Sequence, residues 1–238
     1  MPAAGDPDHS GGHSPSVEWR GAAGEPWVPP RLVTEVTHPL VRHKLGLLRD
    51  TRTTTEMFRR LVNELTLLLT YEATKEMSLE EIEVETPLAR TTAHRIPGKK
   101  VAVCPILRAG MGMLDGVLSL IPVARVGFIG LYRNEETLEP VEYYVKLPAD
   151  IAERDVLVLD PMLATGNSTA AAVATLKAAG ATQIALVALI AAPEGIERLH
   201  RAHPDVRVVV AAVDSHLDER GYIVPGLGDA GDRLYGTK

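Results

Sequence analysis

Residues 154–180 read RDVLVLDPMLATGNSTAAAVATLKAAG, and this stretch decides the fold. The apolar run 156–159 is typical of a strand that is covered on both faces of a parallel sheet. The run ends on Asp160, and the small or hydroxylic residues 164–169 lead into an alanine-rich helix that ends near Gly180. Open parallel sheets bind ligands at the carboxyl ends of their strands. The pattern therefore predicts a buried strand, a polar ligand loop and a helix.

The loop after Asp160 has the composition of a phosphate site. Small residues let backbone N–H groups converge on an anion, hydroxyls add donors, and the helix N-terminus adds its dipole. No Lys follows Gly166, which disfavours the triphosphate loop GxxxxGK[ST]. The alternative is an ordinary strand-to-helix turn that a Ser or Thr side chain caps. We expect a monophosphate on a ligand whose hydroxyls Asp160 holds, and a ribose 5-phosphate fits this description.

Composition sets the class of protein and excludes several others. The 238 residues are 45% hydrophobic and 24% charged, which suits one large α/β domain or two small ones. The net charge of −6 and the lack of a Lys/Arg run disfavour nucleic acid and anionic membranes as partners. Cys104 is the single cysteine, so no internal disulfide forms, and its apolar neighbours predict a buried, inert thiol. With neither a signal peptide nor a membrane-length apolar run, the sequence predicts a cytoplasmic protein.

The chain divides into a short extension and one domain. Residues 1–30 are rich in Pro, Gly, Ser and Ala without apolar periodicity, so we expect a poorly ordered N-terminal extension. Trp19 and Trp27 both lie in it, and we expect at least one of them to pack onto the body or a neighbouring subunit. Residues 31–238 form the predicted domain.

Within this domain, a helical part precedes an alternation of strands and helices. Thr53-x-x-Glu56 predicts a capping box in front of a long amphipathic helix that runs to about Thr74. Residues 80–96 predict a small hairpin. From Lys99 onward, βαβ units predict a mostly parallel sheet. The expected strands are 101–106, 124–129, 156–160, 183–190 and 206–213, and the expected helices are 111–120, 168–179 and 193–202. Between two of these strands, residues 132–147 predict a mobile arm beside the site.

Two segments imitate the dinucleotide fingerprint GxGxxG. Residues 107–112 follow a predicted strand, but Asp115 stands where Gly or Ala is needed for helix packing. Residues 226–231 match the pattern in full, yet no helix is expected after them. Arg108 at a strand end better suits a bidentate clamp on a second phosphate, with a surface salt bridge as the alternative. Arg133, on the predicted arm, is a second candidate clamp.

Residues 221–233 read GYIVPGLGDAGDR, which is too rich in glycine for a regular element and too apolar for a tail. Glycines there let backbone N–H and C=O groups approach a flat ligand edge-on. We therefore expect this segment to bind a small base through main-chain hydrogen bonds.

From about Leu32 to Lys238 the chain closely resembles the uracil phosphoribosyltransferases, a branch of the type I phosphoribosyltransferases. The motifs that carry the resemblance are HPLVRHKLGLLRD, LLLTYEAT, PILRAGMGMLDGVL, YRNEETLEP, LDPMLATGNST, AAPEGIERLHRAHPDV and GYIVPGLGDAGDRLYGT. The resemblance implies an α/β type I fold, in which helices flank a twisted, mostly parallel sheet, with an N-terminal helical part and a small β arm or hood. Pro161 follows Asp160 where most type I relatives have a second acid, as is usual in the uracil branch.

The resemblance implies conversion of uracil and 5-phosphoribosyl 1-diphosphate to UMP and diphosphate with Mg²⁺, which is bound mainly through the diphosphate. It also implies GTP as a candidate effector and a homodimer or larger homo-oligomer. Arg108 and Arg133 are implied to hold the diphosphate, and Asp229 to approach it or its Mg²⁺. The ribose 5-phosphate site is implied at Asp160, Pro161, Met162, Leu163, Ala164, Thr165, Gly166, Asn167 and Ser168, with Asp160 on the ribose hydroxyls. The uracil site is implied at Ile223, Gly228, Asp229 and Ala230.

Three other functions remain open at this point. A phosphoribosyltransferase for orotate would want a cation in the 223–230 loop, which has no Lys or Arg, and one for a purine is a further variant. An RNA-binding regulator on the same fold conflicts with the acidic net charge. A non-catalytic subunit conflicts with the retained Asp160, Arg108 and 165–169 loop.

Overall fold

The computed structural model describes residues 31–97, 100–133 and 140–237. The predicted N-terminal extension, with both tryptophans, lies outside the described residues, so its packing remains a prediction. Among the described residues, no helix has the length and apolar content that crossing a membrane requires.

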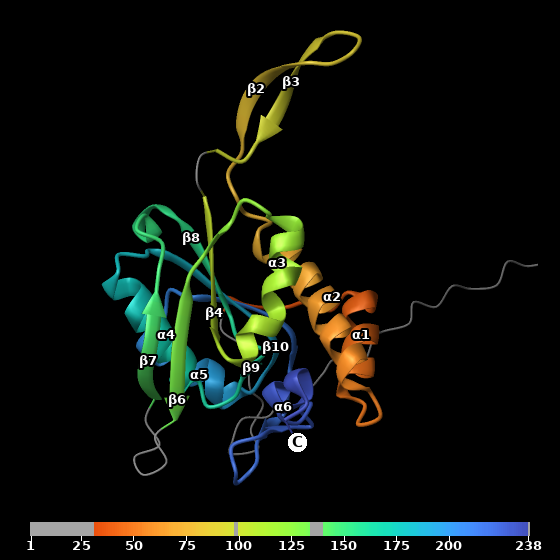
Figure 1. Cartoon of the computed structure of the whole chain (residues 1–238), viewed down its shortest axis with the longest axis vertical. Helices are drawn as coiled ribbons and strands as arrows, with labels where there is room; N and C mark the ends of the chain where they lie inside the picture. Colours follow the sequence, from red (N-terminus) through yellow and green to blue (C-terminus); the bar gives the residue numbers. More distant parts are fainter. Residues whose placement is uncertain (1–30, 98–99, 134–139, 238) are drawn as a thin grey trace, which may run out of the picture.

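The described chain is built on a nine-stranded sheet that is parallel except at one edge (Figure 1). Two short strands, β5 (Arg125–Val126) and β9 (Met162–Leu163), pair with β4 and β10, respectively. Antiparallel pairing occurs between β6 and β7. The other seven strands follow the order β1 (Val33–Glu35), β11 (Arg207–Val213), β10 (Gln183–Ala191), β8 (Asp155–Leu159), β4 (Val101–Leu107), β6 (Phe128–Arg133) and β7 (Pro140–Lys146). The predicted mostly parallel α/β sheet is confirmed.

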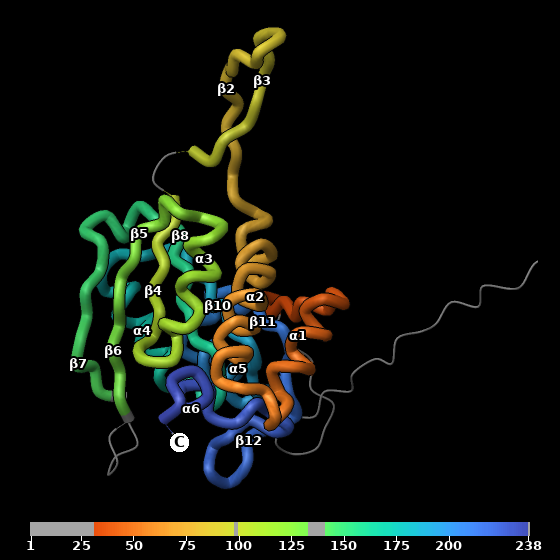
Figure 2. The backbone as a smooth tube through the Cα atoms, turned by 45° about the vertical axis from the view of Figure 1, so that its right-hand side comes forward, coloured from red at the N-terminus to blue at the C-terminus, as the bar shows by residue number. Residues whose placement is uncertain are grey.

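Helices cover both faces of the sheet because successive strand residues point to opposite faces. Val103 and Leu157 pack in one core with the helices α1 (Pro39–Arg49), α2 (Thr55–Ala73), α3 (Leu114–Leu120) and α6 (Ala230–Tyr235). Ala102 and Val156 pack in the other core with α4 (Asn167–Ala178) and α5 (Pro193–Ala202). Figure 2 shows these two layers on either side of the central strands.

Two details of the helical prediction were wrong. The long helix begins one residue later than the capping box predicts, with Thr54 as its N-cap accepting from the Met57 N–H at 3.3 Å. The Thr53 hydroxyl instead donates to the Leu47 carbonyl at 2.6 Å, so it closes the turn between α1 and α2. The helix expected over 111–120 starts as a 3₁₀ turn, η1 (Ala109–Met113), before α3.

Cys104 is fully buried in the central strand β4. Burial raises the pKa of its thiol to about 12, against a smaller opposing effect of a backbone hydrogen bond at Gly127. The predicted burial of this thiol is confirmed, and the raised pKa disfavours the thiolate, which is the reactive form.

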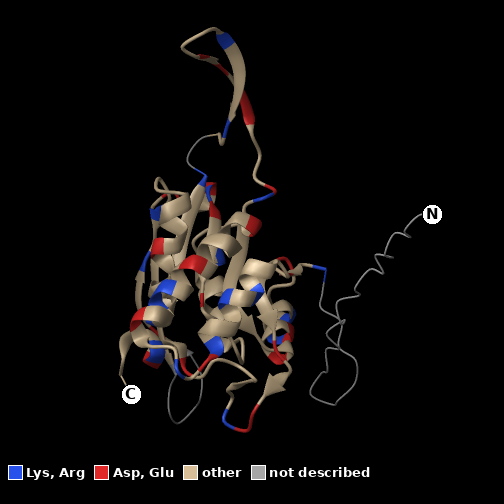
Figure 3. Ribbon diagram, turned by 90° about the vertical axis from the view of Figure 1, so that its right-hand side faces the viewer, with Lys and Arg blue, Asp and Glu red and all other residues tan. Residues whose placement is uncertain are grey.

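The predicted hairpin forms from β2 (Glu80–Glu85) and β3 (Arg90–Arg95), and it projects away from the body in Figures 1 and 2. Ile82 and Val84 lie on one face of the hairpin, and glutamates lie on the other. In Figure 3, basic and acidic positions are interspersed along the ribbon.

Candidate active site

The predicted phosphate loop begins at the carboxyl end of β8, but part of it belongs to the sheet. The Pro161 carbonyl accepts hydrogen bonds from the Leu189 and Ile190 N–H groups at 3.1 and 3.2 Å. Met162 and Leu163 then form β9 against the end of β10. Pro161 and Leu163 are consequently buried, whereas Ala164, Thr165, Asn167 and Ser168 line a cavity.

The turn into α4 is not capped by a side chain. Gly166 is the N-cap residue, with φ of +76°, and no side chain accepts from the first turn of the helix. The alternative of an ordinary turn capped by Ser or Thr is therefore wrong. Since the first N–H groups of a helix have no partner within the helix, they remain available to an anion.

Helix α5 packs directly behind this turn. A Cβ on Gly195 would lie 2.3 Å from the Ala164 carbonyl oxygen and 2.6 Å from that of Leu163, so the glycine permits the approach. Arg198, also on α5, donates through Nε to the Asn167 side-chain oxygen at 3.0 Å. Helix α5 thus contacts the loop through the Leu163 and Ala164 carbonyl groups and through the Asn167 side chain.

Asp160 accepts hydrogen bonds from the Met162 N–H at 3.4 Å and from the Thr169 hydroxyl at 3.2 Å. Burial raises the pKa of Asp160 to about 6, and these two hydrogen bonds oppose the rise. The Asp160 side chain is partly buried, and its carboxyl oxygens are hydrogen-bond acceptors. Such an acceptor suits ligand hydroxyls.

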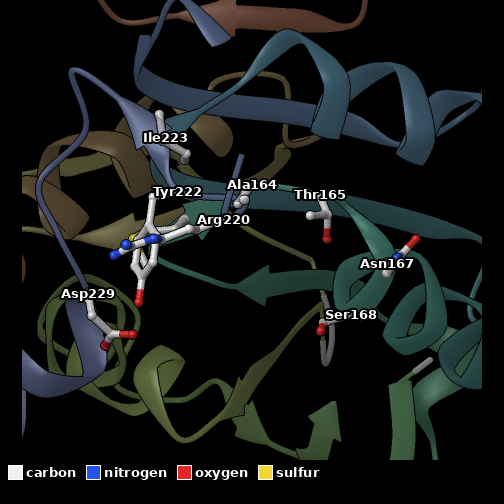
Figure 4. A pocket seen from close by; sticks show the side chains of 10 residues that line it. Ala164, Thr165, Asn167, Ser168, Arg220, Tyr222, Ile223 and Asp229 are labelled. Atoms are coloured by element: carbon white, nitrogen blue, oxygen red, sulfur yellow. The ribbon is translucent and has the colours of Figure 1, made fainter. Parts of the chain in front are cut away.

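On one side of the loop, a cavity of about 380 Å³ separates it from the C-terminal segment. Figure 4 shows Thr165, Asn167 and Ser168 on one side of this cavity and Tyr222 and Asp229 on the other. The lining also includes Ile223 and, beside it, Arg220. Arg220 and Tyr222 are lining residues that sequence reasoning did not assign, although Tyr222 lies in the glycine-rich run that it singled out and Arg220 directly precedes that run.

On the other side of the loop, a cavity of about 230 Å³ is lined by Arg108, Asp160 and Thr169. Met162, Ala164, Thr165 and Ser168 line both cavities, so the loop lies between them. Arg108 is exposed, and the structure shows no salt bridge between it and any residue that it describes. A surface salt bridge, which was the alternative to a phosphate clamp for Arg108, is therefore not found among the described residues.

The glycine-rich segment contains more regular structure than its sequence predicts. Residues Ile223–Val224 form β13, paired with β12 (His216–Leu217), and α6 begins at Ala230. The expectation that no helix follows 226–231 is thus wrong, although α6 has only six residues. The last two residues of the run, Ala230 and Gly231, form the first part of α6, so the run leads directly into a helix.

The four predicted base-binding residues each occupy a different position around this segment. Ile223 is buried and lines the 380 Å³ cavity, whereas Gly228 is exposed on a neighbouring cavity of about 580 Å³. Asp229 lines both cavities and caps α6, accepting from the Asp232 N–H at 2.8 Å. Ala230 is buried and lines neither cavity.

Arg133 ends β6, opposite Pro140 of β7 in the pairing register. The connection between them, residues 134–139, lies outside the described residues. Residues 140–146 of the predicted arm therefore form β7, an edge strand of the main sheet.

Carboxylates are sparse around the two cavities. In the part of the chain that the structure describes, no group of three or more His, Cys, Asp or Glu side chains could hold a metal ion. Asp160 and Asp229 are the acids that line the cavities beside the loop. Mg²⁺ commonly binds through one or two carboxylates, waters and substrate phosphates. This donor set fits a Mg²⁺ that is carried mainly by a diphosphate.

Comparisons with known proteins identify the family of this chain. Residues 35–237 match the family model described as uracil phosphoribosyltransferase. The chain is 61% identical over 206 residues to the uracil phosphoribosyltransferase of Clostridium perfringens, covering 87% of this chain and 99% of that protein. It is 57% identical over 203 residues to that of Streptococcus pyogenes, covering 85% and 97%.

Solved structures show the same fold. The AQ2163 protein of Aquifex aeolicus superposes with a TM-score of 0.82 at 41% identity, covering 87% of this chain and 99% of that one. Adenine phosphoribosyltransferase of Trypanosoma brucei superposes with a TM-score of 0.52 at 12% identity, which shows the shared fold alone. With a family model spanning nearly all of the described residues, the chain belongs to the uracil phosphoribosyltransferase family.

Proposed function

We propose that this chain acts as a uracil phosphoribosyltransferase in pyrimidine salvage. The reaction joins N1 of uracil to C1′ of 5-phosphoribosyl 1-diphosphate, breaks the C1′–O bond and releases UMP and diphosphate. The observation that carries this proposal is the 380 Å³ cavity, in which the phosphate loop faces the glycine-rich C-terminal segment. A phosphate site opposite a main-chain-rich surface suits one ligand that is a ribose phosphate and another that is a flat base.

The 5-phosphate is assigned to the uncapped start of α4. Backbone N–H groups at Gly166 to Ser168, the hydroxyls of Thr165 and Ser168, and the helix dipole all favour an anion there. Asp160, which directly follows the last residue of β8, is assigned to the ribose hydroxyls. The burial of Pro161 and Leu163 leaves their neighbours as the parts of the loop that face the ligand.

The diphosphate is assigned to the side of the loop that Arg108 lines, with Arg133 as a second cation. As the C1′–O bond breaks, the electron pair leaves with the diphosphate, so negative charge grows where Arg108 stands. A preorganised donor at such a position is commonly worth about 3–4 kcal/mol. Mg²⁺ would neutralise charge on the same diphosphate, with Asp160 in the same cavity and Asp229 in the cavity across the loop as the candidate carboxylates.

Uracil is assigned to the main chain around Ile223 and residues 228–230. Its N1 proton must leave, and Asp229 is the acid closest in sequence to these backbone groups. Because Asp229 also caps α6, Asp229→Asn is the informative variant, since Asn caps about as well as Asp. Near-normal turnover in Asp229→Asn would remove Asp229 from any proton transfer and leave catalysis to positioning and leaving-group stabilisation.

The direct test mixes the protein, Mg²⁺ and 5-phosphoribosyl 1-diphosphate with uracil, cytosine, orotate, adenine or guanine in separate reactions. UMP from uracil alone is the expected result. Nucleotide formed from orotate or a purine instead would replace the assigned base. No nucleotide from any base would point to a regulator or a non-catalytic subunit, and RNA binding would then be measured.

A homodimer or larger homo-oligomer is also proposed. Two-stranded hairpins are marginally stable alone, yet β2–β3 projects from the body, with Leu88 97% exposed at its turn. A second copy of the chain would cover the face that carries Ile82 and Val84. Light scattering tests the assembly, and a variant lacking residues 80–95 should be a monomer.

GTP as an effector, a cytoplasmic location and the division at residue 30 rest on the sequence resemblance and composition. Titrating activity and molecular mass against GTP tests the first of these. Deleting residues 1–30 tests the last, because an independent domain should keep its fold and its activity.

A further inference from the structure

Both backbone groups of Gly226, which lies within the proposed base loop 223–230, are held by hydrogen bonds. Arg49, at the end of α1, donates through both terminal nitrogens to the Asp214 carboxylate, at 2.7 and 2.5 Å. The same guanidinium donates to the Gly226 carbonyl at 2.6 Å, and Asp214 accepts from the Gly226 N–H at 2.9 Å. Asp214 is only 6% exposed, so this cycle of charge-assisted hydrogen bonds is largely removed from water.

The next carbonyl along the chain is held by a second arginine. Arg233, on α6, donates to the Leu227 carbonyl at 2.9 Å and to the Asp50 carbonyl at 2.7 Å. Its guanidinium carbon also lies 4.4 Å from the centre of the buried Phe58 ring. Two successive peptide groups are therefore each fixed through their carbonyl oxygen.

Fixing these carbonyls also fixes the N–H groups that follow them. In a planar trans peptide, the C=O of one residue and the N–H of the next point in opposite directions. Gly226 and Gly228 have φ of +64° and +78°, and glycines permit a peptide between them to rotate at small cost. Without the two guanidinium contacts, the Leu227–Gly228 peptide could flip, so that its N–H would point where its C=O had pointed.

That exchange matters for a base that is read by main chain. Uracil carries an oxygen acceptor at C4 and a donor at N3, whereas cytosine carries an amino donor at C4 and an acceptor at N3. The orientation of the loop peptides therefore decides between the two bases. Arg49 and Arg233 line the neighbouring 580 Å³ cavity but not the 380 Å³ cavity, and Asp214 lines neither, so these residues act through the loop on a base bound in the 380 Å³ cavity.

We propose that Arg49 and Arg233, with Asp214, are positioning residues that lock peptides 226–228 and so give the enzyme its preference for a 4-oxo over a 4-amino pyrimidine. This inference rests on the proposed function, because it needs uracil in the 223–230 loop.

The test compares Arg49→Lys and Arg233→Lys with the wild-type enzyme. Lysine keeps the positive charge, and so keeps Asp214 neutralised, but it lacks the fork that reaches two acceptors at once. For each enzyme, KM for uracil, kcat, KM for the phosphoribosyl donor and the inhibition constant of cytosine are measured. We expect the ratio of the cytosine inhibition constant to the uracil KM to fall about tenfold or more, with donor KM unchanged.

Arg154→Lys is the matched control. Arg154 is buried, donates to both carboxylate oxygens of Asp150 at 2.9 and 2.6 Å, and contacts the Val101 carbonyl at 3.4 Å, far from the base loop. It should lose comparable stability in thermal unfolding without any change in the cytosine-to-uracil ratio. If one site variant does not fold, the other carries the test.

An unchanged ratio in a folded site variant overturns the positioning role. So does a ratio that falls equally in Arg154→Lys, since the effect would then follow stability alone. A wild-type enzyme that makes no UMP overturns the proposed function instead, and that measurement precedes the comparison of variants.

Discussion

The Thr169 hydroxyl donates a hydrogen bond to the Asp160 carboxylate across 3.2 Å, and it joins the first turn of α4 to the end of β8. This contact stabilises the charged form of an acid whose pKa burial raises to about 6. Ionisation of Asp160 and the geometry of the phosphate loop are therefore coupled through one buried side chain.

Removing that hydroxyl should move the pH dependence of the reaction. In Thr169→Val the carboxylate loses one donor, so the pKa of Asp160 rises above its value of about 6. If ionised Asp160 accepts from the ribose hydroxyls, the acid limb of kcat/KM for the donor shifts to higher pH. A pH–rate profile from about pH 5 to about pH 9 measures the shift, and Thr169→Ser should keep the wild-type profile. Superimposable profiles for Val and wild type would contradict this role.

Glu35 should make the fold less stable as pH rises. Burial raises its pKa to about 7, Asp214 adds to the rise and Arg42 opposes it. A folded-state pKa above the ordinary 4.5 means that the native state holds the proton more tightly, so stability is lost as pH rises from about 4.5 through about 7. Glu35→Gln should therefore raise Tm at pH 8 and leave it unchanged at pH 4. An equal change at both pH values would contradict the burial argument.

Gly195→Ala should disturb the phosphate loop from behind. The new Cβ would lie 2.3 Å from the Ala164 carbonyl oxygen, a backbone atom that has to move, at a cost of about 1–3 kcal/mol in stability. We expect a rise in KM for the phosphoribosyl donor. Gly46→Ala is the control, because nothing lies within 4 Å of its Cβ in α1, and it should stabilise the fold by about 0.5–1 kcal/mol.

Arg108→Ala should lower turnover about 100-fold or more if the guanidinium stabilises the departing diphosphate. Arg125→Ala is the comparison, since that exposed arginine lies on β5, outside the cavities beside the loop. Steady-state kinetics with uracil gives both values. Equal kinetics for Arg108→Ala and wild type would remove Arg108 from the diphosphate site.

Local patterns in the sequence were enough for most of the elements. The strand, loop and helix of residues 154–180 follow from an apolar run, small residues and helical composition, all of which act over a few neighbours. The end of α5 at Ala202 and the hairpin pairing were predicted for the same reason. The capping box was misplaced by one residue, because the Thr53 hydroxyl donates to the Leu47 carbonyl of the preceding helix while the Thr54 hydroxyl accepts from the Met57 N–H.

The sequence by itself determined the mostly parallel sheet, the placement of Asp160 and Arg108 directly after two neighbouring strands, and the family. Only the tertiary structure decided which loop residues face the cavities, because β9 forms by pairing with β10. It also decided the pKa of Asp160, which depends on burial by residues remote in the sequence. The hydrogen bonds that hold Gly226 come from Arg49 and Asp214, which lie in different parts of the chain. Hydrogen bonds over such separations leave no periodic signal in the sequence, since they depend on how the elements pack.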